Sequence, residues 1–188
     1  SVAAAGPARA ARQGGVLCLC PQRVVARWPL CTMWQTGPLR ACQNGAGRVR
    51  IASYNIRKAV GLDWRRDPGR IMAVLAEMDA DVVLLQEADR RVGQRAGVLP
   101  QQQLDDLGYR LAEVSVRPAS HGWHGNVILV REAFEIAEAK RIDLPSVEPR
   151  GAVSVVIGEP RIEAIGVHLG LNSAMRRKQL AVLDAYAR

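Results

Sequence analysis

A chain of 188 residues with 48% hydrophobic and 23% charged residues has the size and composition of one soluble domain with its own core. No apolar run approaches the ~18 residues that a transmembrane helix needs, so we expect no transmembrane segment and a cytoplasmic location. The formal charge of +8 does not predict a general nucleic-acid-binding face. Residues 1–48 hold six arginines and no acid, which leaves the rest of the chain nearly neutral.

Residues 1–48 lack a sustained helical or alternating pattern, and we expect a disordered leader or a non-native extension. All four cysteines lie in this segment, at positions 18, 20, 31 and 42. Their spacing does not match the paired C-x₂-C of a structural zinc site. A disulfide framework is weakly motivated, because the rest of the chain is large enough to fold without one. We therefore interpret the cysteines as incidental.

The first predicted elements after this segment are a strand, a helix and a second strand. The stretch VRIASYN (49–55) alternates loosely and predicts a strand. Asp67 and Pro68 supply a helix N-cap and a proline at the first helical position. The stretch DVVLLQE (81–87) is apolar on both faces, which predicts a central strand. The helix between the strands has apolar residues at helical spacing: Ile71, Val74, Leu75 and Met78.

A carboxylate ends the second of these strands. If the two strands pair in parallel, both of their carboxyl ends emerge at one edge of the sheet, and Asn55 lies beside Glu87. The alternative is that the strand has simply reached the surface and that Glu87 is its first solvated residue.

The remaining segments predict short strands and few helices, as in a mixed sheet or two packed sheets. A short helix ends before Gly108, and a tight hairpin turn is predicted at residues 158–160. The last helix has Ser173 as its expected cap, with Leu180 and Leu183 on its inner side. The predicted ranges are strands at 110–116, 126–130, 134–142, 152–158 and 161–168, and a helix at 173–187.

Four polar residues stand at strand ends or in the adjoining loops: Asn55, Glu87, Asn126 and His168. Together they suit Mg²⁺ chemistry, because Mg²⁺ prefers oxygen ligands, keeps several waters and takes one or two protein carboxylates. An imidazole near such an ion can donate to a phosphoryl oxygen.

Five motifs in order resemble those of the endonuclease/exonuclease/phosphatase superfamily. They are IASYNIR (51–57), LLQEAD (84–89), GNVILVR (125–131), PRGAV (149–153) and GVHLG (166–170). Each motif is weak alone, but five at plausible spacing form a strong signal, which covers residues 49–188 only. The resemblance implies an α+β fold, a four-layer α/β-β/α sandwich, that hydrolyses phosphoester bonds with a divalent metal.

The resemblance also implies roles for individual residues. Glu87 is the expected metal carboxylate, and Asn55 is expected to bind the Mg²⁺ or Mn²⁺ ion directly or through water. His168 is the expected catalytic residue, which stabilises the charge on the phosphoryl group or protonates the leaving oxygen.

Asn126, His124 and Arg150 are the expected substrate-binding residues. Each has a simpler alternative: Asn126 as a loop-capping amide, His124 as a solvated loop residue and Arg150 as a surface cation. His121 is a weaker candidate than His124. Trp123 either stacks on a substrate or packs its own loop down.

The sequence departs from the family in its last part. The family's Gly-Asp-x-Asn and Ser-Asp-His motifs do not occur, and the only acid after His168 is Asp184. We therefore expect residues 49–188 to be the N-terminal part of such a domain, with the second half of the sandwich missing and weak or no activity. The alternatives are a non-catalytic phosphate-binding module and a scaffold protein. The substrate (a nucleic acid, a lipid headgroup or a small phosphodiester) and the oligomeric state stay open.

Overall fold

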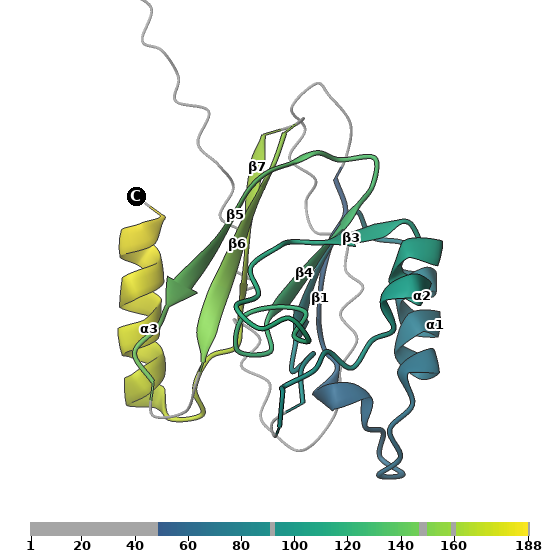
Figure 1. Cartoon of the computed structure of the whole chain (residues 1–188). Coiled ribbons are helices and arrows are strands. Elements are labelled where there is room, and N and C mark those ends of the chain that lie inside the picture. Colours follow the sequence, from purple (N-terminus) through teal and green to yellow (C-terminus); the bar gives the residue numbers. More distant parts are fainter. Residues whose placement is uncertain (1–48, 91–92, 147–149, 159–160, 188) are drawn as a thin grey trace, which may run out of the picture.

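The computed structural model describes residues 49–90, 93–146, 150–158 and 161–187. They form four layers: α3, a three-stranded sheet, a four-stranded sheet, and α1 with α2 (Figure 1). The elements are β1 Ile51–Asn55, the 3₁₀ turn η1 Arg57–Ala59, α1 Pro68–Met78, β2 Val82–Gln86, α2 Gln101–Asp106, β3 Tyr109–Leu111, β4 Val127–Arg131, β5 Ile136–Asp143, β6 Gly151–Ile157, β7 Ile162–Val167 and α3 Ser173–Tyr186. The predicted α+β sandwich is confirmed.

The strand–helix–strand unit forms as predicted. β1 and β2 pair in parallel, with Asn55 opposite Gln86 in the register. The larger sheet has the order β1-β2-β4-β3, so β2 is an interior strand and all five of its residues are buried. α1 begins at Pro68 after Asp67, whose carboxylate pairs with Arg70 and does not cap the helix.

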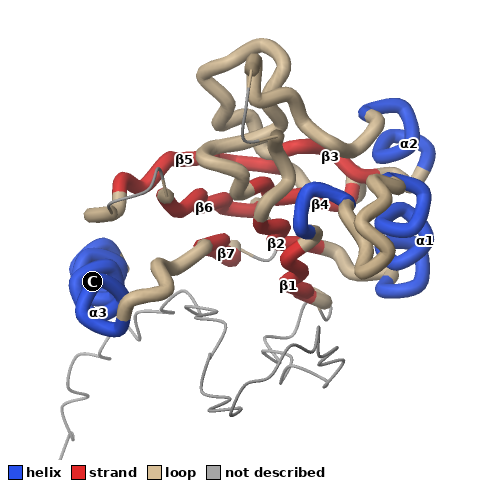
Figure 2. The backbone as a smooth tube through the Cα atoms, turned by 90° about the horizontal axis from the view of Figure 1, so that it is seen from below, coloured by secondary structure: helices blue, strands red, loops and turns tan. Residues whose placement is uncertain are grey.

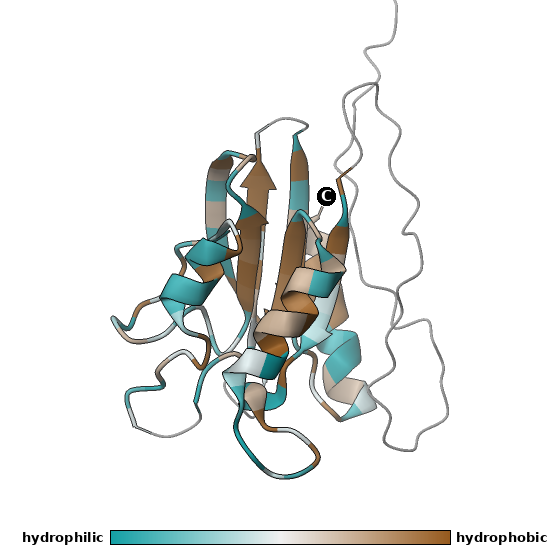
Figure 3. Cartoon of the chain, turned by 90° about the vertical axis from the view of Figure 1, so that its right-hand side faces the viewer, coloured by the Kyte–Doolittle hydropathy of each residue, from teal (hydrophilic) through white to brown (hydrophobic). Residues whose placement is uncertain are grey.

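The larger sheet is buried on both faces, which explains its apolar strands. Val83 and Leu85 of β2 pack with α1 and α2, whereas Val82 and Leu84 face the smaller sheet. Figure 3 shows these apolar strands behind the amphipathic helices. The alternation has the period of two expected of a strand, so a single strand supplies both cores.

The smaller sheet is antiparallel, with the order β5-β6-β7, and its inner face packs on the larger sheet. Gly166 of β7 faces the larger sheet, because a Cβ there would lie at ordinary contact distance, 3.5–3.6 Å, from Ile128 and Leu84. Figure 2, seen from below, shows the two sheets between α3 on one side and α1 and α2 on the other. α3 covers the outer face of the smaller sheet through the buried Leu183.

Three local predictions were wrong. Asn172, not Ser173, caps α3, and its side chain accepts from the N–H groups of Ala174 and Met175. Leu180 is 42% exposed, so of the two predicted leucines Leu183 lies on the inner side of the helix and Leu180 does not. The strand predicted at 110–116 ends at Leu111, because the Val114 N–H turns back to the Ala112 carbonyl.

Some predictions fall outside the described residues. These are the character of residues 1–48, the cysteines within them, and part of the turn at 158–160. β6 and β7, which flank that turn, do pair in antiparallel fashion from Ile157 and Ile162 onward. Among the described residues, no helix has the length and apolar character needed to cross a membrane.

Candidate active site

The topology gathers several chain segments at one end of the sandwich. The carboxyl ends of β1 and β2 lie together because the strands are parallel, and β4 begins at this end because it is antiparallel to β2. β7 packs on β2, with Gly166 facing Leu84, and the residues that follow these strands, Glu87 and His168, line one pocket. The loops after β1, β2 and β7 and those before β4 and β6 therefore surround one space.

Asn55 and Glu87 lie side by side, as predicted. Nδ2 of Asn55 is 3.4 Å from Oε1 of Glu87. Oδ1 of Asn55 accepts a hydrogen bond of 3.0 Å from the Arg57 N–H. The amide therefore turns its NH₂ toward the carboxylate and its oxygen toward the backbone.

Lys58 holds the other oxygen of this carboxylate. Its Nζ forms an ion pair with Oε2 of Glu87, and the two side chains are only 22% and 21% exposed. Burial alone would raise the pKa of Glu87, but Lys58, Asn55 and the charge of His168 outweigh it and lower the pKa. Glu87 is thus ionised at neutral pH.

Backbone contacts fix Glu87 in an uncommon conformation. Its φ of 55° lies in the left-handed region, which non-glycine residues seldom adopt. Its carbonyl accepts from the Lys58 N–H, and the Ala88 N–H donates to the Gly125 carbonyl, both at 2.9 Å. The left-handed region costs on the order of 1–3 kcal/mol per residue, and such strain gathers at functional sites.

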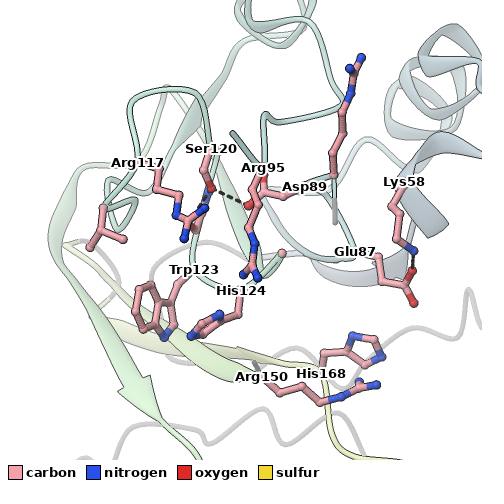
Figure 4. A pocket seen from close by; sticks show the side chains of 14 residues that line it. Lys58, Glu87, Asp89, Arg95, Arg117, Ser120, Trp123, His124, Arg150 and His168 are labelled. Atoms are coloured by element: carbon pink, nitrogen blue, oxygen red, sulfur yellow. Dashed lines mark hydrogen bonds and ion pairs between the residues drawn. The ribbon is translucent and has the colours of Figure 1, made fainter. Parts of the chain in front are cut away.

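A pocket of about 510 Å³ opens beside Glu87. Four predicted site residues line it: Glu87, His124, Arg150 and His168. Figure 4 shows His168 and Arg150 together on the side of the pocket that faces Glu87 and Lys58. The Arg150 Nη1 donates to the Leu169 carbonyl at 3.1 Å, which ties the start of β6 to the loop after β7. A carboxylate, an imidazole and two cations thus face one cavity.

The sequence of the chain matches a known protein family. A sequence profile of the Endonuclease/Exonuclease/phosphatase family matches residues 52–188, most of the chain. The chain belongs to the endonuclease/exonuclease/phosphatase family. The predicted resemblance is confirmed. A search of curated proteins returned no significant match.

Solved structures agree with this fold. An endonuclease/exonuclease/phosphatase from Beutenbergia cavernae is 25% identical with a TM-score of 0.51, over 72% of this chain and 43% of that one. TDP2 from Caenorhabditis elegans is 17% identical with a TM-score of 0.55, over 73% and 40%. ANGEL2, a 2′,3′-cyclic phosphatase solved with adenosine-2′,3′-vanadate, is 18% identical with a TM-score of 0.50, over 73% and 47%. The chain spans less than half of each of these three structures.

Asn126 is buried next to residues that line the pocket and is not itself one of the described residues that line it. It is fully buried, and its Nδ2 donates to the carbonyls of Gly151 at 2.9 Å and Trp123 at 3.3 Å. It does not belong to the residues that line the pocket in the described part of the chain. Its observed contacts connect the start of β4 to the start of β6, and substrate binding by Asn126 stays a prediction.

The residues of the 121–124 loop divide into two kinds. His121 donates from Nε2 to the Leu99 carbonyl at 2.6 Å, so it holds the loop in place. His124 lines the pocket, and its ring lies 4.1 Å from the Trp123 ring, tilted by 53°. The indole of Trp123 lies against Gly151 and also lines the pocket, so packing and ligand contact are compatible.

Several pocket residues were not foreseen from the sequence. Lys58 stands three residues after Asn55, and Asp89 stands two residues after Glu87 in the motif LLQEAD. Their closeness in sequence to Asn55 and Glu87 could have indicated that Lys58 and Asp89 belong to the site. Arg95 lies in the loop between β2 and α2, and Arg117 in the loop between β3 and β4. In such irregular loops, no repeating pattern of apolar residues marks a side chain as facing a pocket.

The donor set fits a hard cation better than zinc. No group of three or more His, Cys, Asp or Glu side chains able to hold a metal ion exists among residues 49–187 as far as they are described. One carboxylate and one neighbouring amide match the sparse protein ligation of Mg²⁺, which keeps most of its waters. Direct coordination by the Asn55 oxygen would require the amide to rotate, whereas contact through water would not.

Proposed function

We propose that this chain carries the metal-binding half of a divalent-metal-dependent phosphoester hydrolase. The observation that supports it is the adjacency of Asn55 and Glu87, together with the pocket that Glu87 and His168 both line. Glu87 would hold Mg²⁺ or Mn²⁺, with Asn55 beside it. Family membership favours this chemistry, because nucleases and phosphatases both hydrolyse phosphoester bonds.

Each residue has a defined task in this proposal. A divalent cation at Glu87 would neutralise charge on the phosphoryl oxygens. His168 would hold a proton within reach of the phosphoryl or leaving oxygen. The Arg150 guanidinium would attract the phosphate into the pocket. Nucleotides, single-stranded ends and small phosphodiesters are all candidate substrates.

A second candidate function is phosphate binding without hydrolysis. It is favoured by the Lys58–Glu87 ion pair and by the lack of a third acidic or histidine ligand in the described part of the chain. A carboxylate satisfied by its own lysine leaves the pocket cationic, which suits an anion even without a metal.

The test is hydrolysis of bis(p-nitrophenyl) phosphate with Mg²⁺ and with EDTA. This chain is measured beside a version extended to a full family domain, each with and without the E87Q substitution. We expect metal-dependent turnover by the extended version, a loss on the order of 10²-fold in E87Q, and weak turnover by the 188-residue chain. E77Q, at an exposed position of α1, is the matched control. Full activity in the extended E87Q variant would refute the proposal.

A further inference from the structure

The pocket has a second end, away from Glu87, that is lined by arginines. Arg95 comes from the loop between β2 and α2, and Arg117 from the loop between β3 and β4. Figure 4 shows both side chains extending toward Trp123 and His124, whereas Glu87 and Lys58 lie across the pocket. In all, five lysine or arginine side chains and two carboxylates line the pocket.

Ion pairs with acidic side chains do not neutralise the positive charges of Arg95 and Arg117 in the described part of the chain. Within the described parts of the chain, no ion pair involves Arg95 or Arg117. Of the two carboxylates in the pocket, Glu87 pairs with Lys58. Asp89 is 8% exposed and accepts from the Ser120 hydroxyl at 2.5 Å and from the His121 N–H at 3.1 Å. A guanidinium without a carboxylate partner at a pocket wall offers a planar set of donors to a phosphate.

The positive charges of Arg95 and Arg117 act on His124, which lines the same pocket. Burial lowers the pKa of His124, and the positive charges of Arg95 and, less strongly, Arg117 lower it further, against the opposing charge of Asp143. The imidazole is therefore neutral at pH 7. The Trp123–His124 pair thus lies in a positive potential, which attracts an anion.

We propose that Arg95 and Arg117 form a second anion subsite, and that the substrate is a compact ligand with two phosphoryl groups. One phosphoryl group lies at the Glu87–His168 end and the other at the arginine end. This inference rests on the proposed function and names its substrate class. The pocket volume of about 510 Å³ lies within the ~300–1,000 Å³ of small-molecule sites. The nearly neutral body of the chain argues against a long duplex, which would need many more phosphate contacts.

The test measures binding by calorimetry in EDTA, with the full chain. Two pairs of probes distinguish the source of the ligand: adenosine 3′,5′-bisphosphate against adenosine 5′-monophosphate, and myo-inositol 1,4-bisphosphate against myo-inositol 1-phosphate. We expect at least one bisphosphate to bind about tenfold tighter than its monophosphate, since hydrogen bonds between charged groups are the stronger ones. R95Q/R117Q should abolish this preference, and R161Q, at an exposed position before β7, should keep it.

Two results would overturn the subsite: equal affinity for both members of each pair, or a preference that survives in R95Q/R117Q. R117Q alone, which changes an exposed side chain, gives the same comparison if the double variant does not fold. The assay measures binding in EDTA and does not depend on hydrolysis. A chain that does not hydrolyse phosphoesters can therefore still show the preference for the bisphosphate. Metal-dependent hydrolysis without the preference would refute the subsite and leave the proposed function in place.

Discussion

The ammonium of Lys58 and the carboxylate of Glu87 form an ion pair at the point where β1 and β2 end. The lysine comes from η1 and the glutamate from the turn after β2, so the parallel pairing of two strands brings opposite charges together. The same carboxylate is the proposed metal ligand. A divalent cation and the ammonium group would therefore compete for the Glu87 carboxylate.

Replacing this lysine should strengthen metal binding. In K58M the carboxylate loses its competing cation, and we expect Mn²⁺ to bind up to about fivefold tighter, because a partly exposed ion pair contributes up to about 1 kcal/mol. The measurement is the free Mn²⁺ signal in electron paramagnetic resonance during a titration. K140M, which removes an exposed lysine from β5, controls for the change in net charge. Weaker binding by K58M would contradict the competition.

Gly125 should matter through its backbone conformation. Its φ is +80°, and a Cβ there would lie 3.5 Å from the Glu87 Cα, which is an ordinary contact distance. Strain from positive φ, not a steric clash, therefore sets the cost, and we expect G125A to lose about 1 kcal/mol of unfolding free energy in urea. G166A is the control, because an added Cβ there would also lie 3.5–3.6 Å from its nearest neighbours, but the φ of Gly166 is not positive. Equal losses of unfolding free energy in G125A and G166A would show that the cost comes from crowding by the added methyl group and not from the positive φ.

Asn126 should contribute to stability before it contributes to binding. N126A leaves the buried carbonyl of Gly151 without its donor, and we expect a loss of about 1–3 kcal/mol in urea denaturation. Q103A, at an exposed amide on α2, should change stability by less than about 0.5 kcal/mol. If N126A instead kept its stability and weakened phosphate binding, the predicted substrate-binding role of Asn126 would be favoured.

The lowered pKa of His124 predicts a pH dependence of stability. The unfolded chain binds a proton at this residue near pH 6.5, whereas the folded chain does so only at lower pH. Stability should therefore fall as the pH drops below 6.5, and the loss should end below the folded pKa. H124N removes the titrating group and, since Asn tolerates left-handed backbone, suits the φ of 52°. Urea denaturation at pH 7 and pH 5 should show a smaller loss in H124N, and an equal loss would contradict the prediction.

Local patterns predicted those elements whose signals lie within a few residues. Asp67 and Pro68 marked the start of α1, and the run of apolar residues in β2 indicated its interior position. The errors came where neighbouring residues offered equivalent signals. Asn172 and Ser173 are both good caps, and the side of α3 that carries Leu180 was decided by the sheet on which the helix packs.

The sequence by itself determined that Asn55 and Glu87 would meet, because parallel pairing and strand length depend on the pattern of apolar residues along the chain. Only the tertiary structure decided which distant groups join them. The packing of β7 on the larger sheet places His168 in the same pocket as Glu87, and the β2–α2 and β3–β4 loops turn Arg95 and Arg117 toward that pocket. Such contacts depend on how two sheets and their loops pack in space, and side-chain direction in an irregular loop has no sequence period.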